Sequence, residues 1–164
     1  MAADCSARRS VVVVGIDGGQ ASVPALRRAL DEARANNGLV EMVTAWTAHD
    51  VTDVPSVWAA AREARRRAVA YQRAVVAACA DALDVPLTGV VVEGPAREML
   101  VLAGRGAACV VLGRALPGRS AIARTCAAEV DCPVLEARPS PAHVPRQRSR
   151  ERSTVRRARP KLRS

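Results

Sequence analysis

SVVVVGIDGGQASVPALRRALDEARANNG, residues 10–38, contains the pattern that decides the fold. Its first part is a run of β-branched residues bounded by glycine and aspartate, which predicts a buried strand over residues 10–17. Apolar residues then recur at helical spacing from Val23 to Ala33, and asparagine and glycine follow. This pattern predicts an amphipathic helix with a C-cap over residues 21–38.

The same alternation of strand and helix patterns continues to residue 137. It predicts further strands over residues 39–46, 87–94, 108–113 and 132–137, and further helices over 57–83, 95–106 and 120–130. Five strands alternating with four helices predict an α/β fold with a doubly wound, mostly parallel five-stranded sheet. Ligands bind such sheets beyond the carboxyl ends of the strands, where the strand order reverses. The loops after the first and fourth strands are therefore the candidate site.

The net charge of +9 is concentrated at the C-terminal end of the chain. Residues 138–164 contain ten Arg or Lys residues and one acidic residue, whereas residues 1–137 contain 15 of each. We predict a disordered N-terminus over residues 1–9, one domain over 10–137 and a disordered basic Arg/Pro-rich tail over 138–164. A neutral domain is not expected to bind nucleic acid through its own surface, so non-specific polyanion contact is assigned to the tail.

Residue types that serve catalysis, metal binding or base stacking are scarce. The aromatic residues Trp46, Trp58 and Tyr71 are too few for a single-strand-binding platform. The five cysteines form no C-x-x-C pair, and His49 and His143 have no metal-ligand spacing. No apolar run is long enough to span a membrane. We therefore expect a cytoplasmic protein with reduced thiols, no metal, no catalytic residues and no enzymatic activity.

The loop after the fourth predicted strand imitates a phosphate-binding P-loop. GRALPGRS, residues 113–120, has the spacing of G-x-x-x-x-G-K-[ST], but Arg119 stands at the lysine position. A P-loop also normally follows the first strand of its fold. A small NTPase using this loop remains an alternative hypothesis, and loss of turnover in Arg119→Ala would favour it. Arg114 and Arg119 flank the loop and are expected to be exposed, flexible clamps for an anion.

Over residues 10–137 the chain resembles the universal stress protein family, whose domain is UspA-like. VVVVGIDGGQASVPALRRALDEA resembles the opening strand, Asp-Gly turn and first helix of that family. VTAW resembles the end of its second strand, VVEGPAREMLVLA its third strand and Gly-Pro turn, and CPVLEA its closing strand. The resemblance implies an adenine-nucleotide α-hydrolase-like three-layer sandwich, a homodimer, and a binding and regulatory role under stress.

The resemblance also implies a nucleotide site with a damaged phosphate loop. In ATP-binding members the loop after the fourth strand contains Gly, two residues, Gly, nine residues, and Gly-Ser or Gly-Thr. Gly113 matches the first glycine, Leu116 replaces the second, and the closing pair falls on Ser120 and Ala121. The interval is thus shorter by six residues. We expect a shortened, degenerate loop with weak or no ATP binding, and no other cofactor; an ATP-binding family member is the alternative.

The predicted site residues match the family's positions or flank the two loops. They are Asp17, Gly18, Ala45, Leu112, Gly113, Arg114, Arg119, Ser120, Ala121 and Ile122. Asp17 stands where the family has a nucleotide-contacting aspartate, but capping of the following turn would explain it equally well. Gly18 and Gly19 permit a positive φ in that turn. Val134 and Leu135 are predicted at the dimer interface, because an apolar edge strand is suited to pairing.

Deletion of the residues after Ala137 tests where the polyanion affinity lies. The deletion removes the +9 charge excess, so retention on a heparin or DNA column at low salt should disappear. The melting temperature should stay nearly unchanged, because the deleted segment lacks the apolar periodicity of a packed element. Undiminished retention, or a melting temperature several degrees lower, would contradict this prediction.

Overall fold

The computed structural model describes residues 9–52, 55–114 and 120–139. Its strands are β1 (Val11–Gly15), β2 (Leu39–Trp46), β3 (Leu87–Glu93), β4 (Cys109–Gly113) and β5 (Val134–Ala137). Its helices are α1 (Ser22–Ala35), α2 (Val57–Ala78), α3 (Ala96–Gly104) and α4 (Ala121–Glu129), with short 3-10 helices η1 (Ala48–Asp50) and η2 (Ala80–Ala82). Each of the predicted strands and helices is present, although several begin or end a few residues from the predicted bounds.

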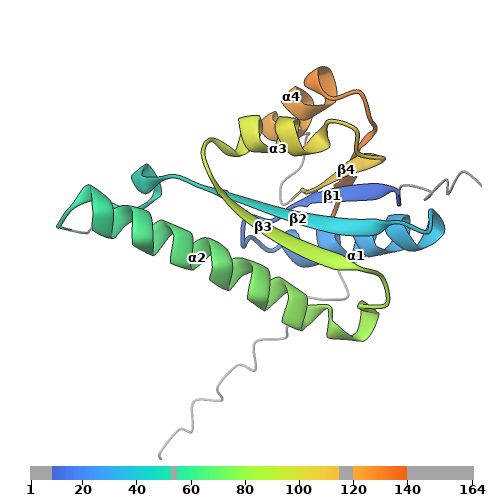
Figure 1. Cartoon of the computed structure of the whole chain (residues 1–164), viewed down its shortest axis with the longest axis horizontal. Coiled ribbons are helices and arrows are strands. Elements are labelled where there is room, and N and C mark those ends of the chain that lie inside the picture. The colour runs from blue at the N-terminus through green and yellow to red at the C-terminus, as the bar shows by residue number, and fades with distance from the viewer. Residues whose placement is uncertain (1–8, 53–54, 115–119, 140–164) are drawn as a thin grey trace, which may run out of the picture.

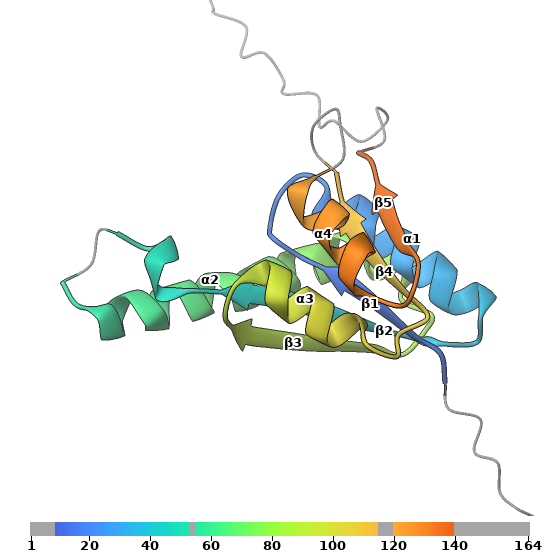
Figure 2. The same ribbon diagram turned by 90° about the horizontal axis from the view of Figure 1, so that it is seen from above.

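The strands form one sheet in the order β3-β2-β1-β4-β5, and every neighbouring pair is parallel. Helices α1 and α2 cover one face of the sheet and α3 and α4 the other (Figures 1 and 2). The chain moves outward from β1 to β3, and then returns to the other side of β1 for β4 and β5. The predicted doubly wound α/β sheet is confirmed, and its order reverses between β1 and β4.

Strand β1 lies at the centre of the sheet and is buried on both faces. Val12 and Val14 pack with α1, whereas Val13 packs with residues of α3 and α4. All three valines are 0% exposed. Burial of each such side chain contributes about 1.5–3 kcal/mol, which explains why the strand is uniformly apolar rather than alternating.

The predicted C-cap of α1 is present, but asparagine takes the left-handed position. Asn37 has a φ of 48°. The amide of Gly38 donates to the carbonyl of Ala33 at 2.8 Å, which closes the last turn of the helix. Gly38 is needed for a different reason: a Cβ placed there would lie 2.3 Å from the carbonyl oxygen of Ser10. The turn therefore brings the start of β2 tightly against the start of β1.

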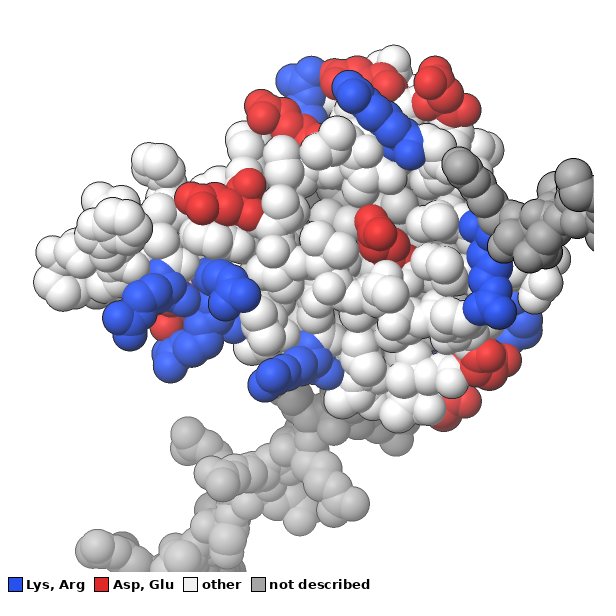
Figure 3. Space-filling view, viewed as in Figure 1, with Lys and Arg blue, Asp and Glu red and all other residues white. Residues whose placement is uncertain are grey.

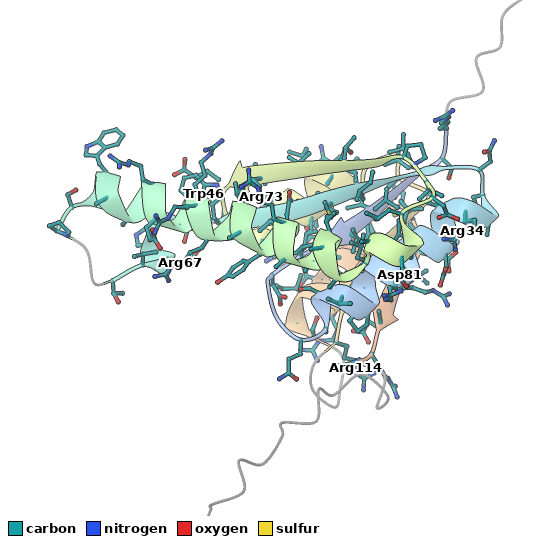
Figure 4. The ribbon with its side chains drawn as sticks, turned by 90° about the horizontal axis from the view of Figure 1, so that it is seen from below. Arg34, Trp46, Arg67, Arg73, Asp81 and Arg114 are labelled. Carbon is teal, nitrogen blue, oxygen red and sulfur yellow. The ribbon has the colours of Figure 1, made fainter. Side chains whose placement is uncertain are left out.

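Helix α2 ends earlier than the sequence predicts. The sequence predicts a helix to residue 83, but α2 ends at Ala78 and the 3-10 helix η2 follows. This change of direction lets Asp81 pair with Arg27 at 2.8 Å and Asp84 pair with Arg34 at 2.6 Å. Figure 4 shows Arg34 and Asp81 at the same end of the molecule. Arg34 lowers the pKa of Asp84, but the pairs are exposed and contribute little stability.

The outer face of α2 is rich in arginine. Arg62, Arg65, Arg66 and Arg67 are exposed, and arginine side chains gather over the N-terminal half of α2 in Figure 3. Glu63 binds Arg66 at 2.8 Å and Arg67 at 3.0 Å. The zero net charge of residues 1–137 is thus unevenly distributed.

Within the described part of the chain, no helix is long and apolar enough to cross a membrane.

Gln72 is a buried polar residue that joins α2 to the sheet. It is 8% exposed, and its Nε2 donates to the carbonyls of Val90 at 2.9 Å and Met42 at 3.3 Å. A Cβ placed on Gly89 would lie 2.5 Å from the Gln72 Oε1. Gly89 therefore makes room for the amide, and the two residues act as one packing unit that the sequence did not indicate.

A double-mutant cycle tests this unit. Gly89→Ala should lower the free energy of unfolding by about 1–3 kcal/mol, because the added methyl group displaces Gln72. In the Gln72→Ala background, the same substitution should cost clearly less, since the displaced amide is gone. Urea unfolding of the four proteins measures the coupling. Strictly additive effects would show that Gly89 does not serve Gln72.

Candidate functional site

A pocket of about 170 Å³ opens at the carboxyl ends of β1, β2 and β4, between α3 and α4. This is the place where the strand order reverses, and therefore where a doubly wound sheet binds its ligands. Most of its lining residues have apolar side chains or none. The lining consists of Gly15, Ile16, Asp17, Val43, Ala45, Ala96, Leu100, Leu112, Gly113, Ser120 and Ile122.

The walls of the pocket are formed by core residues. Val43, Leu100 and Leu112 are buried in the cluster between the sheet and helices α3 and α4. Ala45 and Ala96 are small and leave the space between these walls. Because the larger side chains are fixed by packing, the pocket is a preformed, largely apolar slot.

The backbone of β2 offers a polar edge in this slot. The Leu39 amide donates to the Ser10 carbonyl, and the Ile16 amide donates to the Val43 carbonyl, both at 2.9 Å. Alternate residues of β2 therefore turn their N–H and C=O groups toward β1. The ladder with β1 ends at the pair Gly15–Val43. By the same alternation Ala45 turns its N–H and C=O to that side, beyond the end of β1. The N–H and C=O of Ala45 can therefore hydrogen-bond the edge of a planar ligand.

Asp17 has the capping role that its sequence position suggested, and it also lines the pocket. Its Oδ1 accepts hydrogen bonds from the Gly19 amide and the Ser22 hydroxyl, both at 2.8 Å. Both bonds use Oδ1, so Oδ2 is the atom available to a ligand. Of the two glycines in the turn, Gly18 has a positive φ of 78°, and the ring of Tyr71 packs directly against it. Gly18 shapes the turn but does not line the pocket.

The end of β4 corrects one expectation about the anion clamps. The Arg114 amide donates to the Ala137 carbonyl at 2.8 Å, and its Nη1 lies 3.6 Å from Glu136 Oε2. The Arg114 side chain is only 18% exposed, so the prediction of an exposed, flexible clamp is wrong. The ladder between β4 and β5 continues to the pair Gly113–Ala137 and holds Arg114 against β5 (Figure 4).

Close packing explains why Gly113 ends β4. A Cβ at this position would lie 2.7 Å from both the carbonyl oxygen and the Cβ of Ala21, which precedes α1. Gly113 thus allows the first turn of α1 to pack on the end of β4. The next part of the predicted phosphate loop, including Leu116 and Arg119, lies outside the described residues.

Ser120 begins α4 as its N-cap rather than as its first helical residue. Its hydroxyl accepts a hydrogen bond from the Ala123 amide at 3.0 Å, and its own amide donates to Glu136 Oε1 at 3.4 Å. Ala121 is the first residue of the helix; it is exposed and does not line the pocket. Ile122 lines the mouth and is 40% exposed.

The structure thus brings six of the predicted residues together around the pocket: Asp17, Ala45, Leu112, Gly113, Ser120 and Ile122. Sequence reasoning missed the walls Val43 and Leu100, although Val43 shares a strand face with Ala45 and could have been found by alternation. It also missed Glu136, whose signal is an acidic residue in an otherwise apolar strand. Among the described residues, no group of three or more His, Cys, Asp or Glu side chains could hold a metal ion.

The predicted interface residues lie on the outermost strand of the sheet. Val134 packs toward α3 and α4, and Leu135 packs toward the core on the α1 side. Both are partly buried, and β5 pairs with β4 alone among the described strands. Pairing of two copies through this edge stays a prediction.

Comparison with known proteins gives one family. The universal stress protein family model matches residues 9–138. The fold is similar to that of universal stress protein UspA from Lactobacillus plantarum, with 15% identity over 80% of this chain and 99% of that chain and a TM-score of 0.63. A universal stress protein family member from Burkholderia pseudomallei has 25% identity over 82% and 98% of the two chains and a TM-score of 0.56.

A third solved structure is that of a universal stress protein family protein from Arabidopsis thaliana with AMP bound. It has 13% identity over 84% of this chain and 97% of that chain, with a TM-score of 0.58. No curated protein matches the chain.

Substitutions at Asp17 test its capping role. Asp17→Ala removes two hydrogen bonds of the turn before α1 and should lower the free energy of unfolding by about 1–2 kcal/mol. Asp17→Asn keeps Oδ1 and should retain most of the stability. Urea unfolding measures both, with Ser22→Ala as a variant that loses one of the two bonds. Equal losses in the Ala and Asn variants would contradict the assignment of Oδ1.

Proposed function

The chain belongs to the universal stress protein family, and from that premise we propose that it is a non-catalytic, cytoplasmic stress-response regulator whose pocket binds the adenosine part of an adenine nucleotide. Its affinity for ATP is weak or absent. One observation carries the proposal: a preformed apolar slot lies where the strand order reverses, with the Ala45 peptide and Asp17 beside it. The Arabidopsis thaliana relative that has AMP bound supports this class of ligand.

The slot suits an adenine ring and its ribose. An adenine ring is flat and carries a hydrogen-bond donor next to an acceptor. This pair matches the C=O and N–H of Ala45, which point to the same side of β2. Val43, Leu100 and Leu112 supply apolar contact to the ring faces. The carboxylate of Asp17 can accept hydrogen bonds from ribose hydroxyls. Each neutral hydrogen bond contributes about 0.5–1.5 kcal/mol net, so the base and ribose together can support measurable binding.

The phosphates have less support. A triphosphate needs several converging N–H donors, and the interval from Gly113 to Ser120 is shorter than that of ATP-binding members by six residues. Leu116 stands where a glycine would give the backbone more freedom, and Pro117 has no backbone N–H to donate. Loss of three charge-assisted contacts costs roughly 4.5 kcal/mol, on the order of a thousandfold in affinity.

Two alternatives make different predictions. A small NTPase would hydrolyse ATP and would depend on Arg119, whereas the proposed regulator has no turnover. A protein that acts on nucleic acid through residues 138–164 would lose its activity with that segment and would not need the pocket. We further propose that β5 joins two copies into a homodimer, because β5 is an outer strand and its residues Val134 and Leu135 are only partly buried.

Isothermal titration calorimetry with adenosine and with ATP and Mg²⁺ tests the proposal. The ATP dissociation constant should be weaker than about 100 μM, while adenosine binds measurably. Ala45→Leu fills the slot and should weaken adenosine binding at least about tenfold, because a buried ring has no space beside the added methyl groups. Ala121→Leu is the matched control, since Ala121 is exposed and outside the pocket.

Sub-micromolar ATP binding would contradict the degenerate phosphate loop. Adenosine binding that survives Ala45→Leu would show that the ligand lies elsewhere.

A further inference from the structure

We propose that the carboxylate of Glu136 occupies the place of a ligand phosphate, so that the pocket selects an uncharged nucleoside over its phosphate esters. The inference rests on the proposed function, because it concerns the ligand of the same pocket. Glu136 would thereby be a specificity-determining residue that this chain carries in its last strand.

Strand register places the Glu136 side chain on the face of the sheet that carries the pocket. Glu136 pairs with Leu112, which lines the slot, and neighbouring residues of paired strands share a face of the sheet. The side chain is 15% exposed. Its Oε1 accepts from the Ser120 amide at 3.4 Å, and its Oε2 lies 3.6 Å from Arg114 Nη1. The carboxylate therefore lies between the end of β4 and the start of α4.

The two groups that contact Glu136 are those that would hold a phosphate. The N-terminus of α4 presents backbone amides and the positive end of the helix dipole, and Ser120 lines the pocket. Arg114 follows Gly113, which also lines the pocket. Glu136 supplies an internal anion to both groups. A phosphate ester would have to displace this carboxylate or lie beside it.

The second carboxylate at the pocket acts in the same direction. Asp17 follows β1 and Glu136 belongs to β5, so they stand on either side of β4. Asp17 lines the pocket and Glu136 contacts Ser120, which also lines it, so two carboxylates accompany the guanidinium of Arg114 at this edge of the sheet. Like charges repel a phosphate dianion at short range, whereas a neutral nucleoside is unaffected.

Glu136→Gln tests the inference, because it keeps the shape and the Oε1 acceptor while removing the charge. Calorimetry at fixed ionic strength should show that the wild type binds adenosine more tightly than AMP. In Glu136→Gln, AMP affinity should rise at least about tenfold and adenosine affinity should change less than about threefold. Added salt should reduce the gain in AMP affinity.

Glu129→Gln is the matched control. Glu129 ends α4, is exposed and pairs with Arg97, and neither of these two residues lines the pocket. It changes the net charge by the same amount and should leave the ratio of AMP to adenosine affinity unchanged. An equal gain in this variant would overturn the inference, since it would show a general charge effect.

The remaining outcomes separate the inference from the proposed function. If the wild type binds neither adenosine nor AMP, the proposed function fails. If it binds adenosine but Glu136→Gln leaves the affinity ratio unchanged, only the inference fails. Should Glu136→Gln unfold because the charge of Glu136 no longer faces Arg114, the double variant Arg114→Gln/Glu136→Gln removes both charges. The ratio should then still rise above that of the wild type, because no negative charge faces the start of α4, and an unchanged ratio overturns the inference.

Discussion

The burial of β1 on both faces is the constraint on which the rest of the structure depends. Val12, Val13 and Val14 have no exposed surface, so helices must cover the sheet on both sides. A central strand in a parallel sheet also needs neighbours on both edges, and β2 and β4 provide them. The chain must therefore reverse its direction of travel at β1, and this reversal opens the pocket.

The pocket exists because neighbouring elements end at different levels. β2 continues past the end of β1, so the N–H and C=O of Ala45 face the pocket instead of β1. Gly113 lets the start of α1 pack against β4, and Gly18 lets the Asp17 turn pass beneath Tyr71. Small residues at the strand ends thus bring backbone close together, while Val43, Leu100 and Leu112 keep the slot apolar and rigid.

Charge at the pocket differs from what its separate residues suggested. In isolation Arg114 is an anion clamp and Glu136 is an ordinary strand residue. The β4–β5 ladder places the two side chains together, and the carboxylate contacts the start of α4 as well. An arginine that is already paired offers less to an incoming phosphate than a solvated one. The same argument applies to α2, where Glu63 is shared by Arg66 and Arg67.

The sequence by itself determined the α/β class, the parallel sheet, the order of the elements along the chain and the edge of the sheet at which the candidate pocket lies. These follow from local periodicity and from turn residues, which act over a few positions and are visible in the chain as written. It also indicated half of the pocket, including Asp17, Ala45 and Leu112. Only the tertiary structure decided that Gln72 is buried, that α2 ends at Ala78, and that Arg114 pairs with Glu136. Each of these depends on strand register and helix packing between distant segments, which local patterns do not specify.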